Sequence, residues 1–149
     1  MLATALKQAE PVGTKKPLHW LAWTIFGSYA AFIACVIWIM DSGRGRPIYT
    51  LVGQVPYGDK LGHFVLIGLL CLLLNLALKG KTTPVMNRLV LTGSAWLGLI
   101  VVLEEISQRF IEHRTFDLVD LAADFAGILV AGVLARRLLR ADGARDNQT

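Results

Sequence analysis

The sequence predicts an all-α membrane protein, a polytopic bundle of four transmembrane helices. Hydrophobic residues make up 54% of the 149 residues, which exceeds the apolar share of an ordinary soluble domain. These residues gather in four apolar runs that are separated by polar or Gly/Pro-rich segments. Since a bilayer offers no water to the backbone, each crossing segment must satisfy its own polar groups, and a helix does so.

The first apolar run begins after a short polar and basic segment, residues 1–17, which we predict to be a cytoplasmic N-terminal segment. The run from Leu18 to Met40 is long enough to cross about 30 Å of hydrocarbon as a helix. A signal peptide has a shorter apolar core and a small-residue cleavage site, and this run has neither feature. We therefore expect it to remain as the first transmembrane helix.

The connection between the first and second runs is rich in glycine and proline. This segment, Asp41 to Gly58, is typical of a loop because its composition breaks helices. The second run follows from Leu61 to Leu78, and a short basic turn from Lys79 to Arg88 is predicted after it.

The third and fourth runs complete the predicted bundle. The third extends from Leu89 to Leu103 and continues into the polar string EEISQRF, and the fourth extends from Leu118 to Leu139. We expect a single membrane domain over residues 18–139 and a cytoplasmic tail over residues 140–149.

The distribution of Lys and Arg predicts the orientation, because cytoplasmic loops carry an excess of these residues. One side of the four runs carries ten of them and the other side five. The richer side holds both termini, so we predict that both lie in the cytoplasm. The ten residues are Lys7, Lys15, Lys16, Lys79, Lys81, Arg88, Arg136, Arg137, Arg140 and Arg145.

Composition also argues against several classes of function. The formal charge of +4 is scattered over short stretches and forms no basic face, so no nucleic-acid partner is predicted. Cys35 and Cys71 lie in apolar runs without metal-ligand spacing and are interpreted as buried thiols. No spacing is specific for a metal ion, and no cofactor is indicated.

Polar residues gather near the outer ends of the second, third and fourth helices. Asp59 and His63 stand one turn apart in the motif DKLGH, and Glu105 and Gln108 stand three residues apart in EEISQRF. The motif RTFDLVDLAAD opens the fourth helix. The candidate ligand-binding residues are Asp59, His63, Glu105, Gln108, Arg114, Asp117, Asp120 and Asp124.

Several roles for these residues stay open. Arg114 is the nearest plausible counter-ion, and its guanidinium either ties the loop to the fourth helix or holds an anionic headgroup. Asp117 and Asp120 are candidates both for a helix cap and for a binding role. Adjacent helical positions differ by about 100°, so Glu104 and Glu105 cannot both point inward, and we favour Glu105.

A ridge of small residues on the fourth helix suggests close helix packing. Ala123, Gly127 and Ala131 recur at four-residue steps, which lets a neighbouring helix approach. Such packing would draw Asp120 and Asp124 toward the bundle centre.

Together these motifs resemble the VanZ-like family of small bacterial membrane proteins. The resemblance spans Asp59 to Gly132 and depends on the order of DKLGH, EEISQRF and RTFDLVDLAADFAG. It implies several transmembrane helices and a connection with low-level resistance to glycopeptide antibiotics of the teicoplanin type, but no general reaction. The family's recurring residues map onto His63, Glu105, Gln108, Arg114 and Asp120. Asp124 departs from the family, which usually has asparagine there.

The predicted function is a protein of the bacterial envelope whose outward polar pocket binds the headgroup of a membrane lipid or lipid-linked, amphiphilic compound. One alternative is a membrane enzyme acting on such a lipid, with His63 or Glu105 as general base. Another is a structural subunit that packs against a membrane-protein partner in a larger complex. The sequence leaves open whether catalysis occurs.

Overall fold

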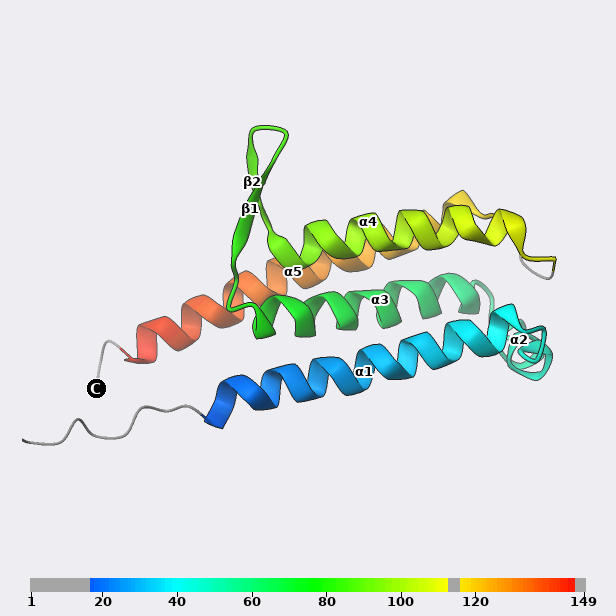
Figure 1. Cartoon of the computed structure of the whole chain (residues 1–149), viewed down its shortest axis with the longest axis horizontal. Helices are drawn as coiled ribbons and strands as arrows, with labels where there is room; N and C mark the ends of the chain where they lie inside the picture. Colours follow the sequence, from blue (N-terminus) through cyan, green and yellow to red (C-terminus); the bar gives the residue numbers. More distant parts are fainter. Residues whose placement is uncertain (1–16, 113–115, 147–149) are drawn as a thin grey trace, which may run out of the picture.

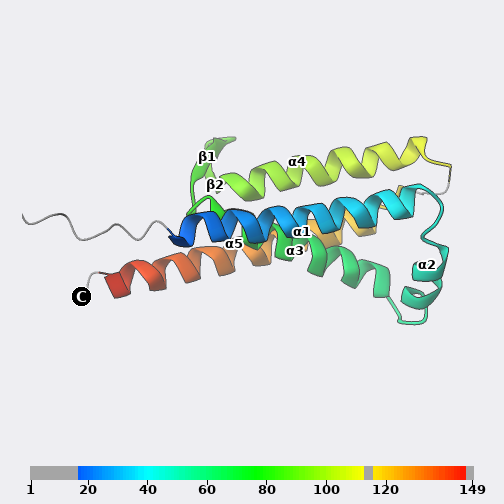
Figure 2. The ribbon, with the colours of Figure 1, turned by 60° about the horizontal axis from the view of Figure 1, so that its bottom comes forward.

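The computed structural model describes residues 17–112 and 116–146 as long helices with one small hairpin (Figure 1). The hairpin lies at one end of the helices and the short helix α2 at the other, in both views (Figures 1 and 2). In chain order the elements are α1 (Pro17–Asp41), α2 (Arg46–Val52), α3 (Gly58–Ala77), β1 (Thr82–Val85), β2 (Arg88–Leu91), α4 (Thr92–Ser107), the 3₁₀ turn η1 (Gln108–Phe110) and α5 (Leu118–Asp146).

Three helices are long and apolar enough to cross a membrane. The corresponding segments are Trp20–Asp41 in α1, Gly58–Ala77 in α3 and Leu118–Ala141 in α5. Helix α4 has 16 residues and falls short of this length. The chain is thus mainly helical and compatible with a multi-pass membrane protein.

Tryptophans near both ends of α1 support its placement across a bilayer. Trp20 and Trp38 are exposed, and the eighteen helical steps from one to the other correspond to about 27 Å at about 1.5 Å per residue. Tryptophan is enriched at both membrane–water interfaces, which lie a similar distance apart.

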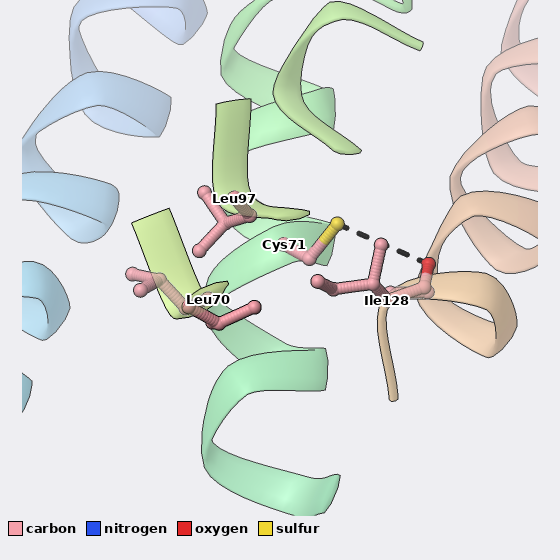
Figure 3. Close-up of a cluster of buried hydrophobic side chains, with 6 residues drawn as sticks. Leu70, Cys71, Leu97 and Ile128 are labelled. Atoms are coloured by element: carbon pink, nitrogen blue, oxygen red, sulfur yellow. Dashed lines mark hydrogen bonds between the residues drawn. The ribbon is translucent and has the colours of Figure 1, made fainter. Parts of the chain in front are cut away.

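Helix α3 is the centre of the bundle, since it packs against α1, α4 and α5, whereas α1 packs mainly on α3. The hydrophobic core lies among α3, α4 and α5 (Figure 3). Tyr29 of α1 reaches this unit by donating a hydrogen bond to the carbonyl of Leu66 at 3.3 Å. The buried core residues are Leu70, Cys71, Leu97, Val101, Ile128 and Ala131.

The closest approach in the bundle joins α3 to α5 at two glycines. A Cβ atom added at Gly68 would lie 3.2 Å from the carbonyl oxygen of Gly127, and one added at Gly127 would clash with the carbonyl oxygen of Phe64. The predicted close packing along the small-residue ridge is therefore confirmed at Gly127, and Ala131 is also buried.

The prediction of a basic turn from Lys79 to Arg88 that leads directly into a helix at Leu89 is wrong. Strand β1 pairs antiparallel with β2, so Thr82 faces Leu91. Met86 and Asn87 between the strands both have positive φ, 42° and 63°, as a two-residue hairpin turn of type I′ requires. Short apolar runs do not distinguish strand from helix by periodicity, and the apolar residues of β2 were therefore assigned to the helix.

Two further boundaries differ from the prediction. The segment Asp41 to Gly58 contains helix α2, in which Pro47 occupies the first turn, where a missing N–H is tolerated. Helix α5 continues to Asp146, so the predicted tail over residues 140–149 is helical in its described part. Helix formation does not end where hydrophobicity ends, because Ala, Leu and Arg all favour helix.

Candidate functional site

The predicted polar residues meet at the end of the bundle that carries α2. Helix α3 begins, α4 ends and α5 begins at this end (Figure 1). One lysine and several acidic and amide side chains from the three helices interact there. The charged cluster, as we name it, consists of Asp59, Lys60, His63, Glu104, Glu105, Gln108, Asp117, Asp120 and Asp124.

Lys60 is the cation at the centre of the charged cluster. Its Nζ lies 2.8 Å from Asp59 Oδ2, 2.7 Å from Asp117 Oδ2 and 2.8 Å from Asp120 Oδ1. It donates hydrogen bonds to Asp59 and Asp117, whereas its contact with Asp120 is an ion pair, since Asp120 Oδ1 accepts no hydrogen bond from the described residues. The side chain is 22% exposed and remains in reach of the surface.

Sequence reasoning missed Lys60 and treated it only as a topology signal. A usable signal was present, because Lys60 falls in the first turn of α3. The positive end of the helix dipole disfavours a cation at that position. A lysine there therefore requires carboxylate partners from elsewhere, and α5 supplies two of them.

His63 joins α3 to α5 in the layer beneath Lys60. Its Nδ1 lies 3.1 Å from Asp124 Oδ1, and its Nε2 lies 3.9 Å from Asp120 Oδ2. Asp124 is buried, whereas the His63 side chain is 26% exposed. Asp59 and His63, which stand one turn apart on α3, have different partners, since Asp59 contacts Lys60.

Glu105 connects the end of α4 to the start of α5. Its side chain is 0% exposed, and its Oε1 accepts a hydrogen bond from the backbone N–H of Asp117 at 2.6 Å. Gln108 Nε2 donates to Glu105 Oε2 at 3.2 Å and to both carboxylate oxygens of Glu104. Glu105 is the buried member of the pair, while Glu104 keeps some exposure and shares the same amide.

Asp117 caps a helix and also forms an ion pair, while its predicted binding role remains a prediction. Its Oδ1 accepts a hydrogen bond from the backbone N–H of Val119 at 2.8 Å, which caps α5. Its Oδ2 binds Lys60. The Lys60 ammonium, with the Val119 N–H as a smaller cause, holds the pKa of the Asp117 carboxyl below its ordinary value.

Arg114 lies outside the described residues, so its predicted role as counter-ion remains a prediction. Among the residues that the structure describes, carboxylates outnumber cations in the charged cluster, and Lys60 is the lysine that they surround. In the same described part, no group of three or more His, Cys, Asp or Glu side chains is arranged to hold a metal ion.

A second set of polar side chains lies inside the core, toward the hairpin end. Asn75 Nδ2 donates to Ser94 Oγ at 3.0 Å and to Cys71 Sγ at 3.3 Å. Cys71 Sγ also lies 3.4 Å from Ser94 Oγ. It is 4.0 Å from the carbonyl oxygen of Ile128, as Figure 3 shows. We name Cys71, Asn75 and Ser94 the neutral cluster. Sequence reasoning interpreted Cys71 as an apolar thiol and missed its partners, although an asparagine within an apolar run marks an interhelical hydrogen bond.

Comparison with protein-family models, curated proteins and solved structures gave no match for this chain. The resemblance to the VanZ-like family therefore rests on the motif residues and remains a prediction.

Proposed function

We propose that this chain is a multi-pass protein of a bacterial inner membrane whose charged cluster binds the headgroup of a lipid or lipid-linked compound. The carrying observation is that α3 and the start of α5 bring Lys60, Asp117 and Asp120 into one ion-pair network at the bundle end. Ionisable residues in membrane helices are costly, and where they occur they mark functional sites by default.

The arrangement of exposure supports a binding role. Asp59, Lys60 and Asp117 keep partial exposure, whereas Glu105 and Asp124 are buried behind them. A headgroup with hydrogen-bonding and charged atoms can replace one of the present partners of the partly exposed residues, Asp59, Lys60 and Asp117. The buried layer would meanwhile hold α3, α4 and α5 in position.

A fourth crossing through α4 is part of the proposal. Sixteen residues of α-helix give about 24 Å, and the three residues of η1 add about 6 Å. Trp96, Leu99, Ile100 and Leu103 present an exposed apolar face along α4, as lipid contact requires. Membership in the VanZ-like family and a link to tolerance of teicoplanin-type antibiotics extend the same proposal.

Native mass spectrometry of protein extracted gently from bacterial membranes tests the binding role. We expect a retained lipid on the wild-type protein and a clear loss of it in Lys60→Met, which keeps the aliphatic stem and removes the ammonium. Lys81→Met is the matched control, because Lys81 is exposed beside the hairpin. Equal lipid retention in both variants would contradict the proposal.

Single cysteines test the orientation in a protein that lacks Cys35 and Cys71. We expect cysteines at Ser42 and Glu112, which are both exposed, to react with impermeant thiol reagents from outside intact cells, and one at Lys81 to stay protected until the membrane is permeabilised. Reaction of all three from outside would rule out the proposed topology.

An enzyme acting on the same lipid is a second candidate, favoured by the His63–Asp124 pair. A carboxylate 3.1 Å from an imidazole nitrogen orients the ring, as in sites where histidine acts as general base. Incubating the protein with bacterial lipid extract and comparing lipid masses with those from His63→Phe tests this function. Identical lipid profiles would exclude catalysis and leave binding.

A further inference from the structure

The surface between α3 and α5 carries an apolar groove of about 220 Å³. Its lining contains only apolar side chains and glycines. Helix α3 contributes Phe64, Gly68 and Leu72, and α5 contributes Gly127, Val130 and Leu134 to this lining.

The groove exists because two glycines meet where the helices are closest. Neither Gly68 nor Gly127 has a side chain to fill the space above the contact, and their backbones already touch. Exposed side chains such as Val65 and Val130 stand beside this contact. In a bilayer such a groove faces hydrocarbon, so chemistry alone favours an apolar occupant.

The groove and the charged cluster lie along the same interface between α3 and α5. On α3, residues 60, 64 and 68 share one helix face at four-residue steps, and on α5 residues 120, 127 and 134 do so at seven-residue steps. The Lys60–Asp120 ion pair of 2.8 Å therefore lies on the same seam as the groove. From residue 64 to residue 72 the groove follows α3 for about 12 Å at about 1.5 Å per residue.

The size of the groove argues for a lipid chain over a helix. A helix with its side chains is about 10–12 Å across, and a space of about 220 Å³ cannot seat it. An extended acyl chain is much narrower, and it reaches the bilayer interior from a headgroup at the helix ends. The groove matches that path.

The charges at the head of the groove identify the lipid class. Asp59 and Asp117 are the exposed carboxylates, and Lys60 lies between them. A headgroup with both an ammonium and a phosphate complements this mixture, because the phosphate can displace an exposed carboxylate from Lys60 and the ammonium can then pair with that carboxylate. Carboxylates outnumber cations among the described residues of the cluster, so a purely anionic headgroup would face an excess of like charge there.

We propose that the groove between α3 and α5 seats one acyl chain of a zwitterionic, amine-bearing phospholipid whose headgroup lies at the charged cluster. This inference rests on the proposed function, and it adds the lipid class and the path of the chain. Val130 and Leu69 are the groove residues that such a chain contacts from the membrane side.

Photolabelling tests the proposal in vesicles that contain a phosphatidylethanolamine with a diazirine in the middle of one acyl chain. We expect label to concentrate on Leu69 and Val130. Val133 serves as the reference, because it is on the same helix and 53% exposed but does not line the groove. Even labelling of all three residues would overturn the proposal.

Filling the groove supplies a matched pair of variants. Val130 is 47% exposed, so Val130→Phe adds volume at the groove without disturbing the core, and we expect a several-fold drop in label on Leu69. Val133→Phe should leave that label unchanged. An equal drop in both variants would contradict binding of the chain in the groove. Equal labelling by the corresponding phosphatidylglycerol would contradict the proposed lipid class.

Lys60→Met separates failure of the groove from failure of the proposed function. Loss of groove labelling in this variant supports a shared ligand. If labelling persists unchanged, the acyl chain does not depend on the headgroup site, and the inferred link between the groove and the charged cluster is overturned; equal lipid retention in native mass spectrometry would overturn the proposed function itself. If the wild-type groove is unlabelled while native mass spectrometry still shows Lys60-dependent lipid, only the groove is overturned.

Discussion

The charged cluster and the neutral cluster lie toward opposite ends of the same three helices and hold them together in different ways. The first uses ion pairs whose outer members reach the surface, such as Asp59 and Lys60. The second uses an amide, a hydroxyl and a thiol, and its Asn75 and Cys71 are fully buried. The charged cluster thus combines exposed ion pairs with the buried carboxyl groups of Glu105 and Asp124, whereas the neutral cluster contains no ionised side chain.

The difference follows from the cost of burial. An unpaired charge in a low-dielectric interior costs far more than a neutral polar group with a partner. Even the neutral cluster is incompletely satisfied, because Asn75 Oδ1 has no hydrogen-bond partner among the described residues and lies against Gly93. We therefore expect the charged cluster to dominate stability and binding, and the neutral cluster to refine helix register.

The largest loss of stability is expected on substitution of Glu105, the fully buried carboxylate of the charged cluster. Glu105→Leu leaves the Asp117 N–H without its acceptor, whereas the Gln108 amide keeps its hydrogen bonds to Glu104. A buried donor without a partner costs about 1–3 kcal/mol, and because Glu105 is fully buried we expect a loss toward the upper end of that range in SDS-induced unfolding in mixed micelles. Glu105→Gln keeps an acceptor oxygen and should lose clearly less. Equal stability of both variants and the wild type would refute the structural role of this carboxylate.

The second-largest loss of stability is expected at the contact between α3 and α5, which lies between the two clusters. Gly127→Ala drives a Cβ atom into the carbonyl oxygen of Phe64, and overpacking of this kind costs about 1–3 kcal/mol. Gly62→Ala is the control on α3, because a Cβ there meets nothing within 4 Å. It should be neutral or stabilising by up to about 1 kcal/mol. The same unfolding titration distinguishes the variants, and matching losses would deny that α3 and α5 are closest at Gly127.

A smaller effect is expected from the neutral cluster. A double-mutant cycle with Asn75→Ala and Ser94→Ala isolates their hydrogen bond of 3.0 Å. Interhelical hydrogen bonds in membrane proteins average about 0.6 kcal/mol and reach about 1.7 kcal/mol, and we expect a coupling energy in that range. A coupling energy larger than the stability loss caused by Glu105→Leu would contradict the expectation that the charged cluster contributes more to stability than the neutral cluster.

The smallest effect concerns the exposed rim of the charged cluster. Because Lys60 lowers the pKa of Asp117, the ionised carboxyl stabilises the fold above its unfolded pKa of about 3.9 and loses this contribution as pH falls through the folded value. Asp117→Asn keeps the helix cap but removes the charge. Wild type should exceed this variant in thermal stability at neutral pH and converge with it in acid. If the difference in thermal stability between wild type and Asp117→Asn grew as pH fell, the predicted stabilising effect of the ionised carboxyl would be wrong.

Local sequence features were sufficient for much of the fold. The apolar runs located α1, α3 and α5, whose membrane-crossing length is confirmed by the structure. The hairpin was not predictable from the same signal, because the apolar residues of β2 continue without interruption into α4. Likewise, α2 is too short to produce a periodic pattern within a Gly/Pro-rich segment.

The sequence predicted which residues form the candidate site better than it predicted which of them contact one another. His63, Glu105 and Asp124 were chosen because polar residues are rare within apolar helices, and the structure places them in one cluster. Lys60 was overlooked because lysine near a helix end is common and is usually read as a topology signal. Its three carboxylate partners come from positions up to 60 residues away in the chain.

The sequence by itself determined which segments form long apolar helices and which ends carry the acidic residues, because hydrophobicity and helical period act over short stretches of chain. Only the tertiary structure decided that Lys60 binds Asp117 and Asp120, that Asn75 meets Ser94, and that a groove opens beside Gly68. These outcomes depend on the rotation and axial shift of one helix against another. The close approach at Gly127 sets both, and no local pattern encodes them.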